Sequence, residues 1–325
     1  MDAGAANALS LGVDFRLPVQ FMSPLALRRA PLRGLLYMLA AVLAFSAMDA
    51  AAKWLTAGYS VVEVAVLSRL ISPFLALAIA LQQGGVSTLK TRHFRWHLFR
   101  AGANGMTLLT FFGALIFLPL ADTVAITFVS PLIMCALAVP MLKEHVGPRR
   151  WAAIVIGFLG VLVITQPSGA GFGWGAVLAL GAAFGDALGI NITRRMSVTE
   201  SSHSMLFWSS VILIVVFGAA VVAEPSLWLM PSAHDLLPIA ILSITGCGAQ
   251  FCLAQAFRYG EVSLLAPLEY GALIWAVIFG YIFWGDLPTL TVLLGVGIII
   301  ASSAYVAHRE ARTKGASALP DRDLI

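Results

Sequence analysis

The 325-residue chain is 60% hydrophobic and only 11% charged, whereas a soluble domain carries about 25% charged residues. Its mean hydropathy is +0.91 and its formal net charge is +4. A water-exposed surface cannot readily be built from this composition, which excludes a soluble globular protein. Apolar runs of about 20 residues recur through the chain, and each is long enough to cross the hydrocarbon core of a bilayer. The sequence therefore predicts an all-α polytopic membrane protein.

Turn-forming and charged residues divide the apolar sequence into ten predicted transmembrane helices. The predicted spans are 34–55, 61–82, 97–118, 121–142, 150–166, 172–193, 203–223, 235–257, 261–284 and 288–307. Tails at 1–33 and 309–325 flank them. Connections such as "TAGYS" and "WGDLP" are very short, so consecutive helices are expected to be antiparallel neighbours.

Lysine and arginine residues are distributed unevenly between the two sets of loops. They follow the even-numbered spans, as at Lys90, Arg92, Arg194 and Arg195, and are missing from the loops after the odd-numbered spans. Cytoplasmic loops of membrane proteins carry an excess of such residues. We therefore expect both tails in the cytoplasm and the helices in the bacterial inner membrane.

A shift of 142 residues reveals an internal repeat. It aligns Ala114 with Ala256 and Glu144 with Asp286. The predicted copies cover residues 34–166 and 172–308 with five spans each, and an odd number of spans inverts the second copy. Inverted repeats are common in secondary transporters, which bind substrate near the membrane midplane between the copies.

Charged and polar side chains inside the predicted spans are candidates for substrate binding, because a charge facing lipid is costly. Small residues share a helix face with Glu269 and with Asp186, so both carboxylates should face protein. Asp186, Gln250 and Glu269 also fall at one predicted height. The candidate substrate-binding or coupling residues are Asn104, Thr127, Asp186, Gln250, Glu269 and Tyr270.

Four further charged residues occupy the first two predicted spans. Asp49 and Lys53 are four residues apart on one face, which favours an ion pair. Glu63 and Arg69 follow in the next span, with Arg69 at the depth of Asp49 and Glu63 at the depth of Lys53. Structural ion pairing and a role in substrate binding both explain these residues, and we expect them to act mainly in assembly.

The segments Ala114–Pro167 and Ala256–Ile300 resemble the two EamA-type repeats of the drug/metabolite transporter superfamily. Within it, "FSAMDAAAKWL", "ESSHSMLFWSS" and "APLEYGALIWA" resemble the branch that contains bacterial S-adenosylmethionine and riboflavin carriers. The resemblance implies ten helices in two inverted halves, a central substrate cavity and alternating access.

The leading functional interpretation is a secondary transporter for a small polar metabolite, similar to S-adenosylmethionine or riboflavin, with a proton as the candidate coupling ion. An exporter of amino acids, drugs or other metabolites with the same fold is the alternative. A membrane-embedded enzyme and a non-transporting scaffold are alternatives of another class. The histidines are scattered over different helix ends and loops, so we expect no metal site, and no cofactor or nucleic-acid partner is expected either.

Overall fold

The computed structural model of the protein describes residues 31–82, 85–142, 147–165, 173–196, 199–259, 265 and 268–317. Every element in these ranges is a helix. The longer ones are α2 (Pro31–Leu55), α3 (Val61–Arg69), α4 (Ser72–Gln82), α5 (Phe94–Phe117), α6 (Leu120–Thr127), α7 (Ser130–Leu142), α8 (Pro148–Thr165), α9 (Trp174–Met196), α10 (Ser202–Ala223), α11 (Leu236–Tyr259), α13 (Gly271–Trp284) and α14 (Leu290–Ser317). Short 3-10 turns η1 (Val86–Leu89), η2 (Pro225–Leu227) and η3 (Ala233–Asp235) lie in the connections.

Within the described residues, six helical segments are long and apolar enough to cross a membrane. Two of them, Val61–Gln82 and Leu120–Met141, each combine a pair of consecutive helices. Three shorter apolar helices lie in α8, α13 and α14. Together with α5, whose polar residues lower its hydropathy, they make up the ten predicted spans.

Two predicted spans are interrupted in mid-course. The span 61–82 breaks between α3 and α4, and the span 121–142 breaks between α6 and α7. Pro73 and Pro131 are each the second residue of the helix that follows the break. Proline lacks an N–H group and is well suited to the first turn of a helix, which agrees with a helix restarting at each of these positions. The last helix also extends beyond its predicted end, to Ser317, and so includes part of the predicted tail.

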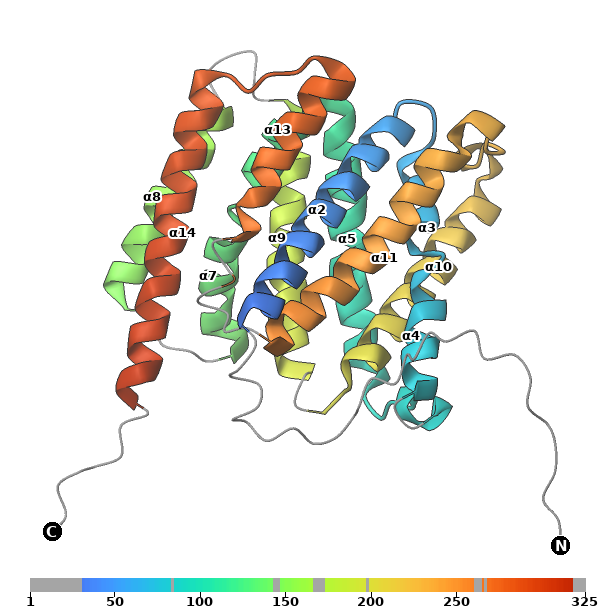
Figure 1. The fold of residues 1–325 in the computed structure, drawn as a ribbon, viewed down its shortest axis with the longest axis horizontal. Coiled ribbons are helices and arrows are strands. Elements are labelled where there is room, and N and C mark those ends of the chain that lie inside the picture. Colours follow the sequence, from blue (N-terminus) through green and yellow to red (C-terminus); the bar gives the residue numbers. More distant parts are fainter. Residues whose placement is uncertain are drawn as a thin grey trace, which may run out of the picture.

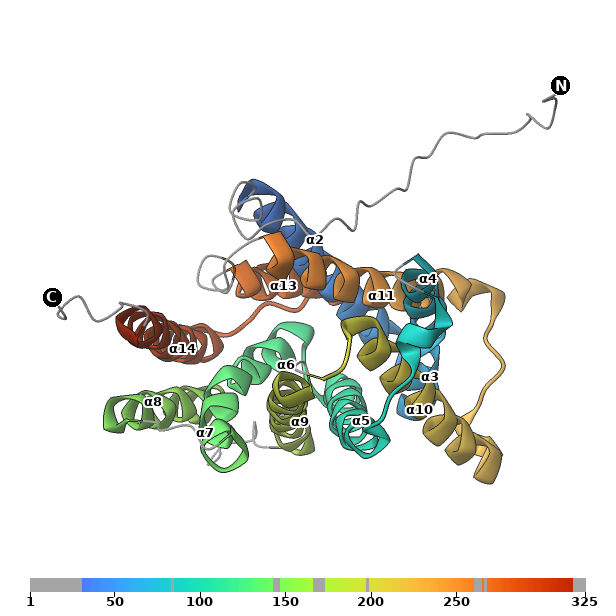
Figure 2. The same ribbon diagram turned by 90° about the horizontal axis from the view of Figure 1, so that it is seen from below.

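The helices form two facing layers. Figure 2 shows α8, α7, α9 and α5 along one side and α14, α13, α2 and α11 along the other. Helices α4, α9 and α14 all end on the same side of the bundle, and the arginines after α4 and at the end of α9 lie there. We call this side the basic end. The start of α2 and the end of α14 both lie at the basic end (Figure 1).

The 142-residue shift reproduces the observed helices. It carries α5 onto α11 residue for residue, and it carries the start of α8 onto the start of α14. The most extensive contacts, α2 with α11 and α5 with α9, are exchanged by the same shift. In two further contacts, α8 with α14 and α3–α4 with α10, the two partners are equivalent elements of the two repeats. The two five-helix halves are therefore related by a pseudo-twofold axis, as the sequence predicted.

Helices α8 and α14 approach each other through glycine. A Cβ atom built on Gly160 would lie 2.8 Å from the carbonyl oxygen of Gly295, and one built on Gly295 would lie 2.6 Å from that of Gly160. Neither position has room for a side chain. The last helices of the two repeats thus touch backbone to backbone.

Large apolar side chains cover the outside of the bundle. On α2, Leu32, Leu36, Leu39 and Leu43 are all exposed, and their spacing of three and four residues places them on one helix face. A surface of this kind suits lipid rather than water. The polar residues considered below lie on other faces.

Candidate functional site

The centre of the bundle is marked by an aromatic contact between the two repeats. Phe128 lies at the break between α6 and α7, and Tyr270 lies immediately before α13. Their rings meet edge to face with centroids 5.3 Å apart. The 142-residue shift places Phe128 on Tyr270 and Thr127 on Glu269. Equivalent residues that touch each other must lie at the pseudo-twofold axis, so the axis passes through this contact.

Two carboxylates lie close to this axis. The Ser130 hydroxyl, in the first turn of α7, donates a hydrogen bond of 2.6 Å to Asp186 Oδ2 on α9. Glu269 is the residue before Tyr270 and so lies at the same axis. Ser130, which was not among the predicted candidates, is the hydrogen-bond partner of Asp186.

Asp186 is exposed to solvent even though it lies in the middle of α9. Phe184, on the lipid side, is 41% exposed. Because successive helix residues are rotated by about 100°, Asp186 points nearly opposite to Phe184. The exposed Asp186 side chain therefore faces the interior of the bundle. Glu269 is exposed as well. Two exposed acidic groups near one axis suit a cation.

The other predicted site residues differ in what surrounds them. Asn104 on α5 donates a hydrogen bond of 3.0 Å to the Ser209 hydroxyl on α10, and its Oδ1 lies against Gly189 of α9. The Thr127 hydroxyl donates to the carbonyl of Val124 in its own helix. Gln250 on α11 is partly buried, and none of the described hydrogen bonds joins it to the other candidates.

Lys53 and Glu63 have partners other than those predicted from helical spacing. Lys53 Nζ donates to Asp286 Oδ2 at 3.3 Å and to the Leu118 carbonyl at 3.2 Å. Glu63 Oε2 accepts a hydrogen bond of 3.0 Å from the backbone N–H of Leu229. Within the described residues no ion pair joins Asp49 or Arg69 to another charge. Spacing identifies residues on one face, but the Lys53 side chain extends away from Asp49 toward the end of the helix.

The Lys53–Asp286 pair bridges the two repeats at the end opposite the basic end. Lys53 belongs to α2, whereas Asp286 follows α13. Lys53 Nζ also lies 5.1 Å from the centre of the Trp284 ring, a cation–π distance. The ion pair, the Leu118 carbonyl and this ring hold that end of the bundle together.

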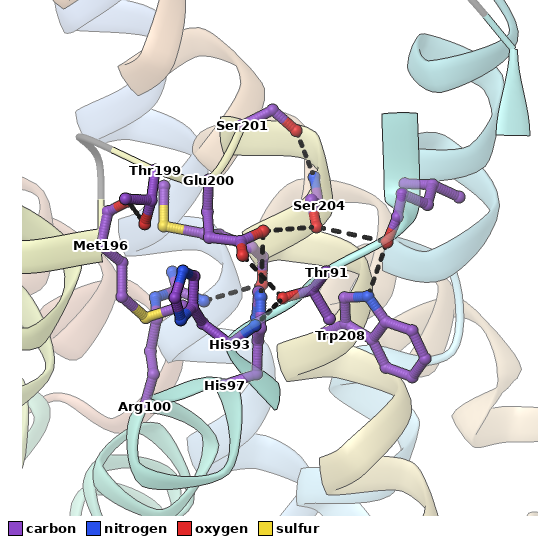
Figure 3. Close-up of polar contacts among 12 residues, drawn as sticks. Thr91, His93, His97, Arg100, Met196, Thr199, Glu200, Ser201, Ser204 and Trp208 are labelled. Atoms are coloured by element: carbon purple, nitrogen blue, oxygen red, sulfur yellow. Dashed lines mark hydrogen bonds and ion pairs between the residues drawn. The ribbon is translucent and has the colours of Figure 1, made fainter. Parts of the chain in front are cut away.

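A second polar cluster lies at the basic end and was not predicted from the sequence. Figure 3 shows Glu200 at its centre, between Thr91 and Ser204. Glu200 Oε1 accepts a hydrogen bond of 2.6 Å from Thr91, and Oε2 lies 3.4 Å from the Ser204 hydroxyl and from His97 Nε2. The side chains of His97 and Glu200 are 0% and 5% exposed. Trp208 Nε1 donates to the Leu89 carbonyl and extends the cluster.

The sequence does carry a signal for this cluster. Ser204 and Trp208 are four residues apart in "ESSHSMLFWSS" and share one face at the start of α10, and Glu200 comes just before the residue that caps this helix. Ser201 caps that helix by accepting from the Ser204 N–H at 3.2 Å. A carboxylate next to a helix cap indicates that the Glu200 side chain has a fixed position. Two of its partners, Thr91 and His97, lie about 100 residues earlier in the chain.

Within the described residues, no group of three or more His, Cys, Asp or Glu side chains could hold a metal ion.

The model of the EamA-like transporter family matches residues 32–166 and 173–307. The chain belongs to the EamA-like transporter family. It is a multi-pass membrane transporter, not an enzyme.

Curated relatives of this transporter are similar over most of its length. The riboflavin transporter of Vibrio cholerae is 26% identical over 292 residues, which cover 89% of this chain and 97% of the relative. The S-adenosylmethionine uptake transporter of Rickettsia bellii is 29% identical over 283 residues, which cover 85% and 94%. A protein of known crystal structure matches 88% of this chain and 99% of its own with a TM-score of 0.62 and 20% identity. This last likeness supports the fold.

Proposed function

We propose that this EamA-family protein is a secondary transporter that moves a small polar metabolite with a cationic part across the bacterial inner membrane by alternating access. A substrate similar to S-adenosylmethionine fits best. The proposal rests chiefly on the acidic pair Asp186 and Glu269, both of which lie near the pseudo-twofold axis. Two carboxylates near one axis gain from a cation bound beside them. S-adenosylmethionine carries such a charge on sulfur, whereas riboflavin is neutral.

The aromatic pair at the axis supports a substrate that also has a flat ring. Tyr270 is partly exposed and next to Glu269, so an adenine or isoalloxazine ring could stack beside it while a cationic group reaches the carboxylates. In this proposal Asn104, Thr127 and Gln250 supply neutral hydrogen-bonding groups around the same space. An EamA-type exporter of amino acids or drugs remains the second candidate, because the same acidic pair would bind an amine.

Coupling and orientation complete the proposal. Glu269 makes no hydrogen bond or ion pair within the described residues, so it is free to exchange a substrate cation for a proton. We place both termini and the basic end in the cytoplasm, because arginine and lysine are absent from the opposite loops. The repeats 34–166 and 172–308 are the halves that move relative to each other.

Uptake and counterflow in proteoliposomes test the substrate. The panel contains S-adenosylmethionine, riboflavin and several amino acids, each supplied as labelled compound against an unlabelled internal pool. We expect saturable counterflow of S-adenosylmethionine. Flux of riboflavin alone would contradict the cationic assignment, and absence of flux for every compound would contradict transport of this class of metabolite.

Cysteine labelling tests the orientation separately. In a background with the three native cysteines replaced, Ser226→Cys in the α10–α11 connection should react with an impermeant reagent from outside cells. Arg92→Cys at the basic end should react only after permeabilisation. The reverse pattern would overturn the cytoplasmic assignment of both termini.

A further inference from the structure

Arg69 is a partly buried charged residue that makes no hydrogen bond or ion pair within the described residues. It is the last residue of α3, at the break before α4. Its Nε atom is fully buried and makes no hydrogen bond within the part of the chain that the structure describes. No described carboxylate pairs with it. A buried charge without a counter-charge is unfavourable, so this guanidinium requires either a ligand or water.

A second arginine, Arg100, lies on α5, a helix that contacts α3. Arg100 Nε donates to the Thr193 hydroxyl at 2.8 Å, and a terminal nitrogen donates to the Met205 carbonyl at 2.8 Å. Both α3 and α5 also contact α10, at whose start Met205 lies. Within the described residues no ion pair joins Arg69 or Arg100 to a carboxylate. Two cations on contacting helices, neither of them paired with a carboxylate, form a site that an anion would neutralise.

Arg100 is bound to the face of α9 that carries Asp186. Arg100 bonds to Thr193, which follows Asp186 by seven residues, or about two turns and 10 Å along the helix. Gly189, halfway between them, lies against Asn104. The Arg100 guanidinium and the Asp186 carboxylate therefore lie along one stripe of α9, with the Asn104 amide between them.

We propose that Arg69 and Arg100 form an anion subsite that binds a carboxylate of the transported molecule. The planar guanidinium of Arg69 suits the two oxygens of a carboxylate. This inference rests on the proposed function and narrows the substrate class to zwitterions, with the cationic part at Asp186 and Glu269 and the carboxylate at the arginines. Arg69 is then a binding residue and not a member of an ion pair that serves assembly.

Matched ligands that differ only in the anionic group test the subsite. Purified protein is titrated with S-adenosylmethionine and its decarboxylated form, with riboflavin 5′-phosphate and riboflavin, and with lysine and cadaverine. We expect wild type to bind the anionic member of its preferred pair about tenfold more tightly or better. Arg69→Gln should abolish this preference while the affinity for the member without the anionic group stays unchanged. Equal affinity for both members in wild type, or an unchanged preference in Arg69→Gln, would overturn the subsite.

Two further variants guard against misinterpretation. Arg69→Lys keeps the charge but loses the planar pair of donors, and it should retain part of the preference. Arg92→Gln removes an exposed arginine at the basic end, and it should behave as wild type. A loss of preference in Arg92→Gln equal to that in Arg69→Gln would attribute the effect to overall charge and contradict the subsite.

A measurement with a bare carboxylate separates this inference from the choice of substrate. Sodium acetate is compared, at constant ionic strength, with the bulky sulfonate of a buffer that cannot enter the protein. Acetate should raise the melting temperature of wild type, because a ligand that binds only the folded state stabilises it. The rise should be absent in Arg69→Gln. If no member of the panel binds but this difference is seen, the proposed substrate is wrong and the anion subsite stands. If acetate acts equally on both proteins, the subsite is wrong whatever the substrate.

Discussion

The ring of Phe128 meets the ring of Tyr270 edge to face, and these two residues occupy the same position in the two repeats. The pseudo-twofold axis therefore passes between them. The preceding residues, Thr127 and Glu269, flank the axis as a hydroxyl and a carboxylate. The duplication has kept the aromatic contact and changed the polar group beside it, so the two sides of the centre differ in charge.

The carboxylate at Glu269 can be tested without changing its shape. Glu269→Gln keeps a hydrogen-bonding side chain of the same size and removes the charge that would bind a cation or a proton. We expect normal expression and a loss of transport of tenfold or more, or a loss of its pH dependence, measured as initial uptake into proteoliposomes. The matched control is Glu224→Gln, since Glu224 is exposed in the α10–α11 connection. Wild-type uptake and pH profile in Glu269→Gln would leave this residue with a structural role only.

The ion pair between Lys53 and Asp286 closes the end opposite the basic end, so weakening it should open that end. Lys53 Nζ and Asp286 Oδ2 are 3.3 Å apart, and the two side chains are 11% and 34% exposed. Lys53→Gln and Asp286→Asn should each increase labelling of a cysteine placed at Thr56, which is buried in the structure. The double variant should behave as either single one, because both remove the same contact. Additive effects of the two substitutions would show that they act independently.

Glu200 is expected to stabilise the basic end. It accepts bonds from Thr91 and faces the buried His97. Glu200→Ala leaves these groups without a partner, and we expect a loss of roughly 3 kcal/mol of unfolding free energy, the usual range for breaking a buried polar pair. Glu200→Gln, which keeps an acceptor for Thr91, should lose less. The measurement is the melting temperature of the purified protein, and equal values for wild type and Glu200→Ala would contradict this role.

The glycine contact between α8 and α14 predicts a difference between two glycine-to-alanine substitutions. A Cβ atom at Gly160 would approach the Gly295 carbonyl to 2.8 Å, whereas one at Gly102 on α5 would meet nothing within 4 Å. We expect Gly160→Ala to destabilise the protein by about 1–3 kcal/mol through overpacking. Gly102→Ala should be neutral or stabilising by up to about 1 kcal/mol, because alanine favours a helix. A similar change of melting temperature in both variants would contradict the close contact.

Most of the fold followed from the sequence because its signals are local or periodic. Apolar length fixed the number of spans, and the 142-residue period paired α5 with α11. The helix breaks were less visible. Pro73 and Pro131 lie in the first turn after each break, but whether a helix restarts there depends on which backbone groups the neighbouring helices can satisfy. The period alone would have indicated that Phe128 and Tyr270 lie near the axis.

The candidate site was predictable in its residue types and only partly in its contacts. Small-residue faces singled out Asp186 and Glu269, and the structure has Asp186 bonded to Ser130 and Glu269 beside Tyr270. The partners of Lys53 and Glu200 could not be found by spacing, since Asp286 and Thr91 lie 233 and 109 residues away in the chain. Such contacts depend on helix rotation and on side-chain length, which a single sequence does not determine.

The pairing of α2 with α11 and of α5 with α9 has a consequence for biosynthesis. Each pair consists of one helix from the first half and one from the second. In each half, two helices therefore have their most extensive contacts with a helix of the other half. While the ribosome is still making the second half, the first must remain in the bilayer with Asp49, Lys53 and Arg100 lacking their final surroundings. Contacts between residues so distant in sequence form late and slowly. A separately expressed first half should therefore be degraded, and co-expression with the second should rescue it.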